Sequence, residues 1–371
     1  MCYVRGTFHG TFPTEILLLT SLKLLQLDNN GLTGTLPTDI GNLTSLNLLS
    51  LYRNYFSGTL PTEIGKLTSL DYLNLYGNSF NGTLPTEIGL LTNLNYLDLD
   101  NNTFTGTLPA PFHSLNPVSS PSASPASSPV SPPAASPFWP TSQPTRLPTT
   151  QPTSNPSGQP SSNPTTLRCT NSIFVCGKLY TCNTTELSYE GLCESNLPTE
   201  IGLLTNLTTL VFYRNSLTGT LPTEIGLLRS LNSLLLFSNT FTGTLPTEIG
   251  LLTSLQSLWL HSNTFNGTLP TEIGHLTSLN ALLLSSNTFT GTLPTEIGLL
   301  TSVQSLWLHS NTFNGTIPTE IGHLTSLHAL LLNNNKLTGT LPTEIGLLTS
   351  LNYLRLDSNI FNCPFYITAL D

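Results

Sequence analysis

Aromatic and imidazole side chains recur at a fixed spacing in the second half of the chain. Trp259 and His261 stand close together in the sequence, and Trp307 and His309 repeat the pair further along the chain. Tryptophan is among the residue types most enriched in binding hot spots, and histidine can change its charge near neutral pH. The pairs suggest a binding surface, in which we expect the histidines to act as polar rim residues rather than as pH sensors.

The same two sequence positions recur with a constant period throughout the chain and define a wider candidate site. In the second half these positions are mostly apolar or aromatic, as expected of a contact surface. The predicted ligand-binding residues are Tyr213, Leu235, Phe237, Trp259, His261, Leu283, Trp307, His309, Leu331 and Arg355. In the first half the equivalent residues are mainly polar: Gln26, Asp28, Ser50, Tyr52, Asn74, Tyr76, Asp98 and Asp100. Residues 251–298 and 299–346 match at 41 of 48 positions, so drift after one duplication is the alternative explanation for the repeated tryptophan.

A 24-residue repeat must position these side chains. The hexapeptide LPTEIG or a close variant begins at Phe12, Leu36, Leu60, Leu84, Leu197, Leu221, Leu245, Leu269, Leu293, Ile317 and Leu341. A period of this length is typical of solenoids, in which stacked coils bury a continuous core. Leu258 and Leu260 have the period-2 spacing of a strand with one buried face, while Ile273 and Leu276 lie on a return segment. We expect the recurring asparagine, such as Asn263, to satisfy backbone groups at a sharp corner.

The full pattern LxxLxLxxNxFxGTLPTEIGxLTS resembles the plant-type leucine-rich repeat. That repeat type occurs in the ectodomains of receptor-like kinases and receptor-like proteins, in polygalacturonase inhibitors, and in algae and other protists. The resemblance covers about three-quarters of the chain. It implies a right-handed superhelix with a concave parallel sheet and recognition of a protein, peptide or glycan. The chain departs from that family in its cysteine module, which lacks the usual tryptophan, and in the proline tract that divides its repeats.

We therefore predict an α/β fold, a right-handed β/α solenoid in two arrays separated by a disordered linker. From Pro117 to Pro164, proline occurs mostly at every fourth position. A tract with this composition cannot bury apolar surface in a core. The expected parts are a first array at 2–115, a Pro/Ser/Thr-rich linker at 116–168, a cysteine-rich N-terminal cap at 169–196, a second array of seven repeats at 197–362, and a tail at 363–371.

Four cysteines crowded into one short stretch indicate an oxidising compartment. Cys169, Cys176, Cys182 and Cys193 are the disulfide candidates, and their connectivity is left open. A zinc site is less favoured, because the stretch has no Cys-x-x-Cys pair and no histidine. Seven Asn-x-Ser/Thr sequons are candidate glycosylation sites: Asn42, Asn81, Asn101, Asn183, Asn206, Asn266 and Asn314.

Charge and hydropathy narrow the partners and the location. Only 8% of residues are charged, and 11 of the 20 acidic residues occupy a single repeat position. Because the basic residues are nowhere clustered, we expect no nucleic acid partner. No apolar stretch is long enough to span a membrane. The chain starts within a repeat, so we expect a preceding segment with a signal peptide to be missing from this sequence. The expected location is extracellular or at the cell surface.

Recurring glutamates and threonines could suggest other functions, and the sequence has no catalytic motif. The glutamate of each repeat could attract calcium, but compensation of a helix dipole explains it with fewer assumptions. Threonine files, such as Thr244/Thr247 and Thr268/Thr271, resemble ice-binding surfaces. No hydrolase, phosphate-loop or kinase signature occurs, so we expect no catalysis, cofactor or bound metal.

The sequence thus predicts a non-catalytic recognition protein of the receptor-like, defence or signalling type. It would bind a protein, peptide or glycan on the concave face of the second array. The alternatives are a structural cell-wall or adhesion protein and an ice-binding protein.

Overall fold

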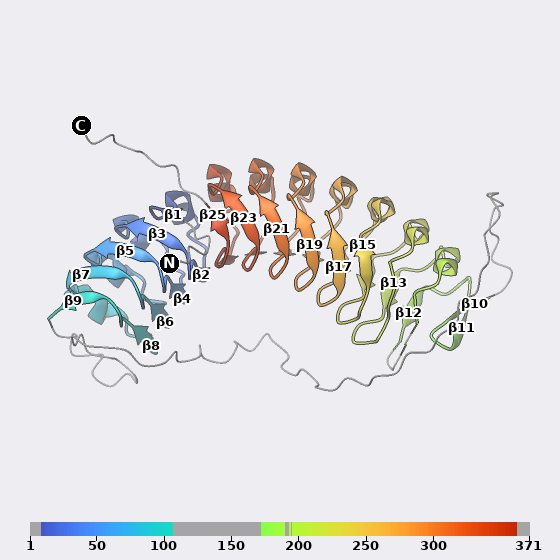
Figure 1. Ribbon diagram of the computed structural model, residues 1–371, viewed down its shortest axis with the longest axis horizontal. Coiled ribbons are helices and arrows are strands. Elements are labelled where there is room, and N and C mark those ends of the chain that lie inside the picture. Colours follow the sequence, from blue (N-terminus) through green and yellow to red (C-terminus); the bar gives the residue numbers. More distant parts are fainter. Residues whose placement is uncertain (1–8, 107–171, 190–192, 194, 362–371) are drawn as a thin grey trace, which may run out of the picture. The chain divides into compact units, whose positions relative to one another are not determined.

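The computed structural model describes residues 9–106, 172–189, 193 and 195–361 (Figure 1). The described residues belong to one compact unit. The expected linker at 116–168 and the tail at 363–371 lie outside the described residues.

One strand from each coil joins a twelve-stranded sheet, and every neighbouring pair in it is parallel. The alternation of buried leucines and outward side chains gives these three-residue strands one core face. In spatial order they are β12 (Glu186–Ser188), β13 (Thr209–Val211), β14 (Ser233–Leu235), β16 (Ser257–Trp259), β18 (Ala281–Leu283), β20 (Ser305–Trp307), β22 (Ala329–Leu331), β24 (Tyr353–Arg355), β2 (Leu24–Gln26), β4 (Leu48–Ser50), β6 (Tyr72–Asn74) and β8 (Tyr96–Asp98).

A second strand in most coils builds lateral parallel sheets. The second array contributes β15 (Thr242–Thr244), β17 (Thr264–Gly267), β19 (Thr288–Gly291), β21 (Thr312–Gly315), β23 (Lys336–Gly339) and β25 (Ile360–Phe361). The first array contributes β1 (His9–Gly10), β3 (Gly31–Gly34), β5 (Tyr55–Gly58), β7 (Ser79–Thr83) and β9 (Thr103–Thr105). An antiparallel hairpin, β10 (Ser172–Val175) with β11 (Lys178–Thr181), precedes β12.

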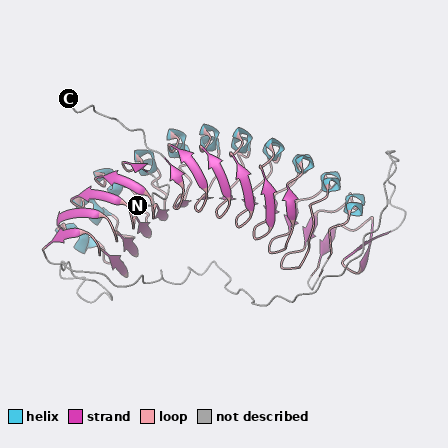
Figure 2. Ribbon diagram, in the orientation of Figure 1, coloured by secondary structure: helices cyan, strands magenta, loops and turns pink. Residues whose placement is uncertain are grey.

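The PTEIG segment of each repeat forms one turn of 3-10 helix, and Figure 2 shows these helices in a file beside the strands. Proline precedes each helix in an extended conformation, and the acidic residue occupies the first turn, as its attraction to the helix dipole favours. The helices are η1 (Thr14–Leu18), η2 (Thr38–Asn42), η3 (Thr62–Lys66), η4 (Thr86–Leu90), η6 (Thr199–Leu203), η7 (Thr223–Leu227), η8 (Thr247–Leu251), η9 (Thr271–His275), η10 (Thr295–Leu299), η11 (Thr319–His323) and η12 (Thr343–Leu347).

The core lies between the long sheet and the helices. Leu258, Leu260 and Ile273 are fully buried, as their repeat positions predict. A phenylalanine from most coils adds a stacked spine, in which the ring centroids of Phe265 and Phe289 lie 6.1 Å apart. Burying a side chain of this size stabilises the fold by roughly 1.5–3 kcal/mol.

The recurring asparagine holds neighbouring coils together, as predicted. The Nδ2 atom of Asn263 donates to the carbonyl oxygens of Leu236 and Leu260, each at 3.0 Å. Its Oδ1 atom accepts the backbone N–H of Phe241 at 3.1 Å. One side chain therefore satisfies backbone groups of its own coil and of the coil before it.

The order of strands in the long sheet differs from chain order. β24, the last strand of the second array, pairs in parallel with β2, the first strand of the first array. The backbone N–H groups of Lys23 and Leu24 donate to the carbonyl of Asn352 at 2.8 and 3.0 Å. The sequence favoured two separate solenoids, whereas the structure joins the strands of both arrays in one sheet. We call the pairing of β24 with β2 the joint.

Candidate ligand-binding face

The register of the long sheet brings the predicted ligand-binding residues onto its outer face, the face that the resemblance predicts to be concave. Leu235, Trp259, Leu283, Trp307, Leu331 and Arg355 are paired in that order across successive strands. They form one continuous row, which we call the central row. Tyr213, Phe237, His261 and His309 follow the strands two positions later and form a second row, the flanking row.

Rings of the flanking row stack on one another. The ring centroids of Tyr213 and Phe237 lie 4.8 Å apart, and those of Phe237 and His261 lie 4.5 Å apart, with interplanar angles of 3° and 10°. Aromatic pairs at such distances contribute roughly 0.5–1.5 kcal/mol beyond the area they bury. The stack covers both faces of Phe237 and one face each of Tyr213 and His261.

The tryptophans of the central row lean against the flanking row. Trp259 is tilted by 48° to Phe237 and by 49° to His261, and Trp307 is tilted by 44° to His309. Leu283, which lies between the two tryptophans in the central row, is 5% exposed. His309, beside Trp307, is 7% exposed. The surface offered to a ligand is therefore built mainly by the half-buried tryptophans, Leu235 and Leu331.

Several polar atoms on this face have no partner within the described part of the chain. The indole Nε1 atoms of Trp259 and Trp307 and the Nδ1 atom of His261 are buried without a hydrogen bond to any described residue. A buried polar group left in this state costs about 1–3 kcal/mol. The two indoles stand at equivalent positions, so the same unsatisfied donor occurs twice on one row.

The two histidines of the flanking row are held uncharged. Burial lowers the pKa of His261 to about 4. Burial, followed by the positive charges of Arg355 and His261, lowers the pKa of His309 to about 4. Both rings are therefore neutral at physiological pH, where they act as aromatic surface. The sequence predicted polar rim residues, whereas the structure places His261 in the ring stack and buries His309.

The outer face continues past the joint as a polar surface. Gln26 pairs with Arg355, and Ser50, Asn74 and Asp98 follow. Burial raises the pKa of Asp98. The polar character predicted for the first array is thus placed on the same face as the aromatic rows.

One pair of rings on the first array was missed by the sequence analysis. Tyr72 and Tyr96 stack with centroids 4.2 Å apart on the outer face. They occupy the first residue of each strand, and the same alternation that places the central row outward also places this position outward. Grouping the residues that stand two positions before the central row in each coil would have identified this pair.

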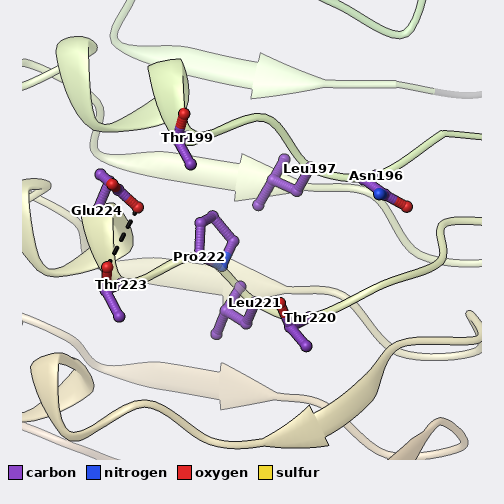
Figure 3. A pocket seen from close by; sticks show the side chains of 8 residues that line it. All are labelled: Asn196, Leu197, Thr199, Thr220, Leu221, Pro222, Thr223 and Glu224. Atoms are coloured by element: carbon purple, nitrogen blue, oxygen red, sulfur yellow. Dashed lines mark hydrogen bonds between the residues drawn. The ribbon is translucent and has the colours of Figure 1, made fainter. Parts of the chain in front are cut away.

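Outside this face, a shallow groove lies between the first two coils of the second array. It has a volume of about 450 Å³ and is lined by Asn196, Leu197, Thr199, Thr220, Leu221, Pro222, Thr223 and Glu224 (Figure 3). Thr223 Oγ1 donates to Glu224 Oε2 at 3.2 Å. Glu224 is the one ionisable residue in this lining, which offers a general acid or base no second group to work with.

The cysteine cap and the sequons can be placed in part. A disulfide joins Cys176 to Cys193, and Cys182 is also disulfide-bonded. Cys169 lies outside the described residues. The side chains of all seven sequon asparagines are exposed, so each could accept a glycan without unfolding: Asn42, Asn81, Asn101, Asn183, Asn206, Asn266 and Asn314.

The described residues contain neither a metal cluster nor a membrane span. No group of three or more His, Cys, Asp or Glu side chains that could hold a metal ion occurs among them. No helix in that part of the chain is both long enough and apolar enough to cross a lipid bilayer.

Parallel strands, one-turn helices and an asparagine ladder, repeated from coil to coil, define a leucine-rich repeat solenoid. The chain belongs to the leucine-rich repeat family. The family model described as Leucine-rich repeat region matches residues 176–282. The single-repeat model, Leucine Rich Repeat, matches residues 21–43, 45–67, 69–91, 93–115, 302–324 and 326–348. No curated protein matches the sequence.

Solved structures with this fold come from plants and bacteria. The plant peptide hormone receptor RGFR1, in complex with RGF2, is 29% identical over 97% of this chain and 47% of that chain, with a TM-score of 0.48. The Leptospira interrogans LRR protein LIC12759 is 31% identical over 95% of this chain and 76% of that chain, with a TM-score of 0.43. The structure of PEPR1 with AtPEP1 is 25% identical over 96% of this chain and 44% of that chain, with a TM-score of 0.42. The chain thus spans less than half the length of both receptors.

Proposed function

We propose that this protein is a non-catalytic recognition protein whose second array binds a peptide or an extended protein segment. The observation that carries the proposal is the pair of adjacent rows on the outer face of the long sheet. Aromatic and aliphatic side chains of the central row stand in register there over five strands, β14 to β22, and Arg355 of β24 follows them. A contiguous apolar surface of this kind on a protein rich in polar residues is typical of a binding site.

The ring geometry favours a peptide over a glycan. Sugars stack on the open faces of aromatic rings, but the faces of Phe237 are covered by Tyr213 on one side and His261 on the other. What remains open of Phe237 is its edge, which lies beside half-buried tryptophan and leucine side chains. Such a surface fits the alternating side chains of an extended peptide better than it fits a flat sugar ring.

Two features would support tight binding. The stacked rings are already ordered, so little side-chain entropy is lost when a ligand arrives. The indole N–H groups of Trp259 and Trp307 have no acceptor among the described residues. A ligand carbonyl that meets these groups after a small rotation of the indoles would remove an existing cost.

The direct test removes both indoles. Peptides would be selected with the wild-type protein from a random displayed library, and their affinities measured for Trp259→Ala/Trp307→Ala. Loss of a hot-spot tryptophan costs at least about 2 kcal/mol, so we expect affinity to fall by roughly 30-fold or more. The thermal midpoint should change little, because both side chains lie outside the core.

The matched control is Leu251→Ala/Leu299→Ala. These leucines lie at the ends of η8 and η10, directly before the coils that carry the two tryptophans, and are 42% and 51% exposed. Their removal should leave peptide affinity unchanged. Equal affinity of the tryptophan variant and the wild type would contradict the proposed site, as would a protein that binds glycans on an array and selects no peptide.

An extracellular or cell-surface location belongs to the same proposal. It is supported by the disulfide between Cys176 and Cys193 and by the exposure of every sequon asparagine. Secretion from a eukaryotic host, followed by enzymatic removal of N-glycans, should lower the apparent mass. A protein that carries no glycan after secretion would count against this part of the proposal.

The ice-binding alternative depends on the lateral sheets, where Thr244, Thr268 and Thr292 are exposed in successive coils. Asn266 and Asn314 lie in the same sheet, in β17 and β21. A glycan on either would cover the flat threonine surface, so glycosylation at these sites and ice binding exclude each other. Thermal hysteresis of protein that carries no glycan at Asn266 and Asn314 would favour ice binding over the proposed function. An adhesion role would instead predict binding to cell-wall preparations that survives the tryptophan substitutions.

A further inference from the structure

The joint buries apolar surface that neither array can cover by itself. Leu351 and Leu354 of the last coil of the second array are fully buried, and so are Leu22 and Leu25 of the first coil of the first array. The end coil of a solenoid exposes its core unless something caps it. In this protein each array provides the cap for the end of the other.

At its strand edge the joint has bonds as short as those inside the arrays, but at two points it is looser. The hydrogen bond from Leu356 N to Gln26 O measures 3.4 Å, while the equivalent bonds inside the arrays measure 2.8–3.0 Å. A Cβ atom added to Gly346 would lie 3.3 Å from Glu15 O across the joint, against 2.5–2.9 Å at the equivalent glycines. The backbones of η12 and η1 are therefore farther apart at this point than those of the other helix pairs in which glycine faces glutamate.

The asparagine ladder is also incomplete at the joint. Asn30 Nδ2 donates to the carbonyl of Leu27 at 2.8 Å, within its own coil. Its Oδ1 atom is buried and has no partner among the described residues. By contrast, Asn54 in the next coil accepts the N–H of Leu32 and donates back to Leu27. Within the described part of the chain, this atom of Asn30 therefore makes no bridge to the coil before it.

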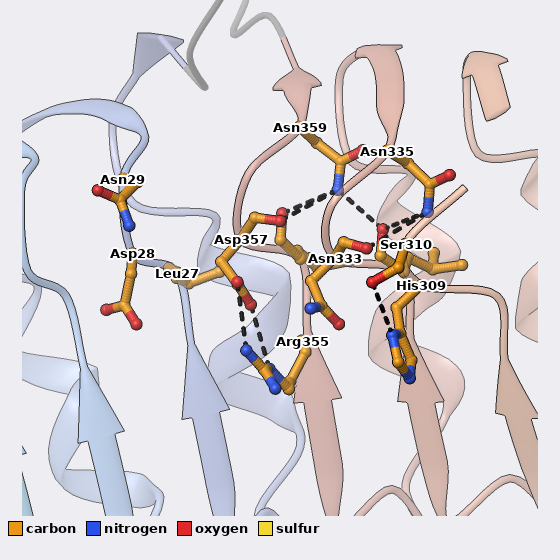
Figure 4. Close-up of polar contacts among 12 residues, drawn as sticks. Leu27, Asp28, Asn29, His309, Ser310, Asn333, Asn335, Arg355, Asp357 and Asn359 are labelled. Atoms are coloured by element: carbon orange, nitrogen blue, oxygen red, sulfur yellow. Dashed lines mark hydrogen bonds and ion pairs between the residues drawn. The ribbon is translucent and has the colours of Figure 1, made fainter. Parts of the chain in front are cut away.

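Buried charge faces the joint from both sides (Figure 4). Asp28 of the first array is 4% exposed and Asp357 of the second array is 6% exposed. Arg355 makes an ion pair with Asp357 of its own coil at 3.2 Å, and among the described residues no ion pair joins it to Asp28. On the side away from the joint, Asp28 accepts hydrogen bonds from Ser50 and from the backbone N–H of Tyr52. The phenol of Tyr72, farther along the face, interacts electrostatically with Asp28.

The chain is long enough for the first array to reach the end of another molecule. Sixty-five residues separate Gly106 from Ser172. At about 3.3 Å per residue they can extend to about 215 Å, several times the roughly 53 Å that eleven strand spacings of about 4.8 Å would cover. Docking within one chain and docking between two chains are both allowed by length.

We propose that the joint is an exchangeable docking interface, through which the first array caps the second array of its own chain or that of a second copy of this protein. The partner is fixed by complementarity: only a coil with the same register offers both the parallel strand edge and the matching leucine layer. Exchange of an identical element is a low-cost route to dimers, because it needs no contact that the monomer lacks. This inference is independent of the proposed ligand.

Cysteines placed on the paired strands test the proposal in the full-length chain. Gln26 and Arg355 are opposite each other in β2 and β24, and neighbouring strands are at a distance that a disulfide can bridge. With both Gln26→Cys and Arg355→Cys in one chain, we expect a bond within that chain at low concentration. When the two single variants are mixed at high concentration, covalent dimers should form between chains.

The matched control mixes Val211→Cys with Leu235→Cys. These residues are paired in the same way between β13 and β14, but inside the second array, so no dimers should form. Mass spectrometry of the linked peptides identifies the bond, because the chain has other cysteines. If the double variant makes no bond, the joint itself is wrong. If it makes the bond but the mixture never links, docking is confined to one chain and the proposal fails.

A third arm uses the charges at the joint. Burial, and then the neighbouring charge of Asp357, raises the pKa of Asp28 to about 7, with Arg355 and the hydrogen bonds from Ser50 and Tyr52 opposing the shift. At pH 8 the carboxylate is ionised and the docked state is weakened. Adding Asp28→Asn to the mixed single variants at pH 8 strengthens docking, so the rate at which chains open and link to each other should fall roughly tenfold. An unchanged or increased rate at this pH would contradict the role given to the joint.

Discussion

At the scale of single residues, the recurring asparagine decides how firmly two coils are joined. Its amide both donates and accepts across the coil boundary. This explains why asparagine recurs in nearly every coil while the outward residues differ from coil to coil. The sequence identified this role correctly, because a short amide at a corner has few other uses. What it could not show is that, among the described residues, Asn30 lacks the bridge that its equivalents make.

That difference between asparagines can be measured. Asn263→Ala leaves the carbonyls of Leu236 and Leu260 and the N–H of Phe241 without their partner, so we expect a loss of about 2–4 kcal/mol in the free energy of unfolding. Asn30→Ala removes the side-chain bond to Leu27 and should cost about 1 kcal/mol. Chemical denaturation of both variants tests this. Equal losses of unfolding free energy would contradict the statement that Asn30 lacks the bridge between coils.

At the scale of elements, the 3-10 helices stack closely because glycine follows isoleucine in nearly every coil. A Cβ atom added to Gly250 would lie 2.5 Å from the backbone oxygen of Glu272 in the next coil. The first coil has Leu17 at this position, and the acidic residue opposite it is Asp39 rather than glutamate. The smaller acid in the coil that follows Leu17 is consistent with a need for space there.

Gly250→Ala should therefore destabilise the fold by about 1–3 kcal/mol, because two backbones must separate. Gly346 provides the matched control, since across the joint its nearest backbone neighbour is 3.3 Å away and the closer atom is the flexible end of Leu18. Gly346→Ala should leave the thermal midpoint within error of the wild type. A loss as large as that of Gly250→Ala would mean that the joint is as tight as an internal contact.

Most elements could be predicted from the repeat, but the details of the face could not. The strand with Leu258 and Leu260 and the short helix with Ile273 lie where the pattern places them. The sequence did not show that the corner residue before each asparagine, such as Ser262, takes a left-handed conformation with φ of 57°. It also did not show that Tyr213, Phe237 and His261 cover one another's faces, since stacking depends on rotamers that spacing alone does not fix.

At the scale of the whole molecule, the order of coils is the feature that the sequence concealed. Because the repeats are nearly identical, the repeat pattern alone does not show which two end coils will meet. The proline tract suggested two independent arrays. Yet that tract is long enough for the first array to follow the second in the sheet, so the strand order runs from β12 to β24 and then from β2 to β8.

The charge at the joint makes the stability of this arrangement depend on pH. The pKa of Asp28 rises from 3.8 to about 7 on folding, with burial as the main cause, so the folded protein binds the proton more tightly than the unfolded chain. Its contribution to stability is fully present below about pH 4 and is lost as the pH rises to 7. Three pKa units correspond to about 4 kcal/mol, which is an upper bound for the effect.

Asp28→Asn should remove this dependence while keeping an oxygen that can accept the N–H of Tyr52. We expect the variant to melt at a higher temperature than the wild type at pH 8 and at nearly the same temperature at pH 4. The comparison must be made between the two proteins at each pH, because the lowered pKa values of His261 and His309 act in the opposite direction in both. Asp98→Asn is the control, since the pKa of Asp98 is also raised by burial but the residue lies in β8, far from the joint in strand order. If Asp28→Asn lowers the melting temperature at pH 8, the carboxylate stabilises the joint as a charge, and the pH response assigned to it is reversed.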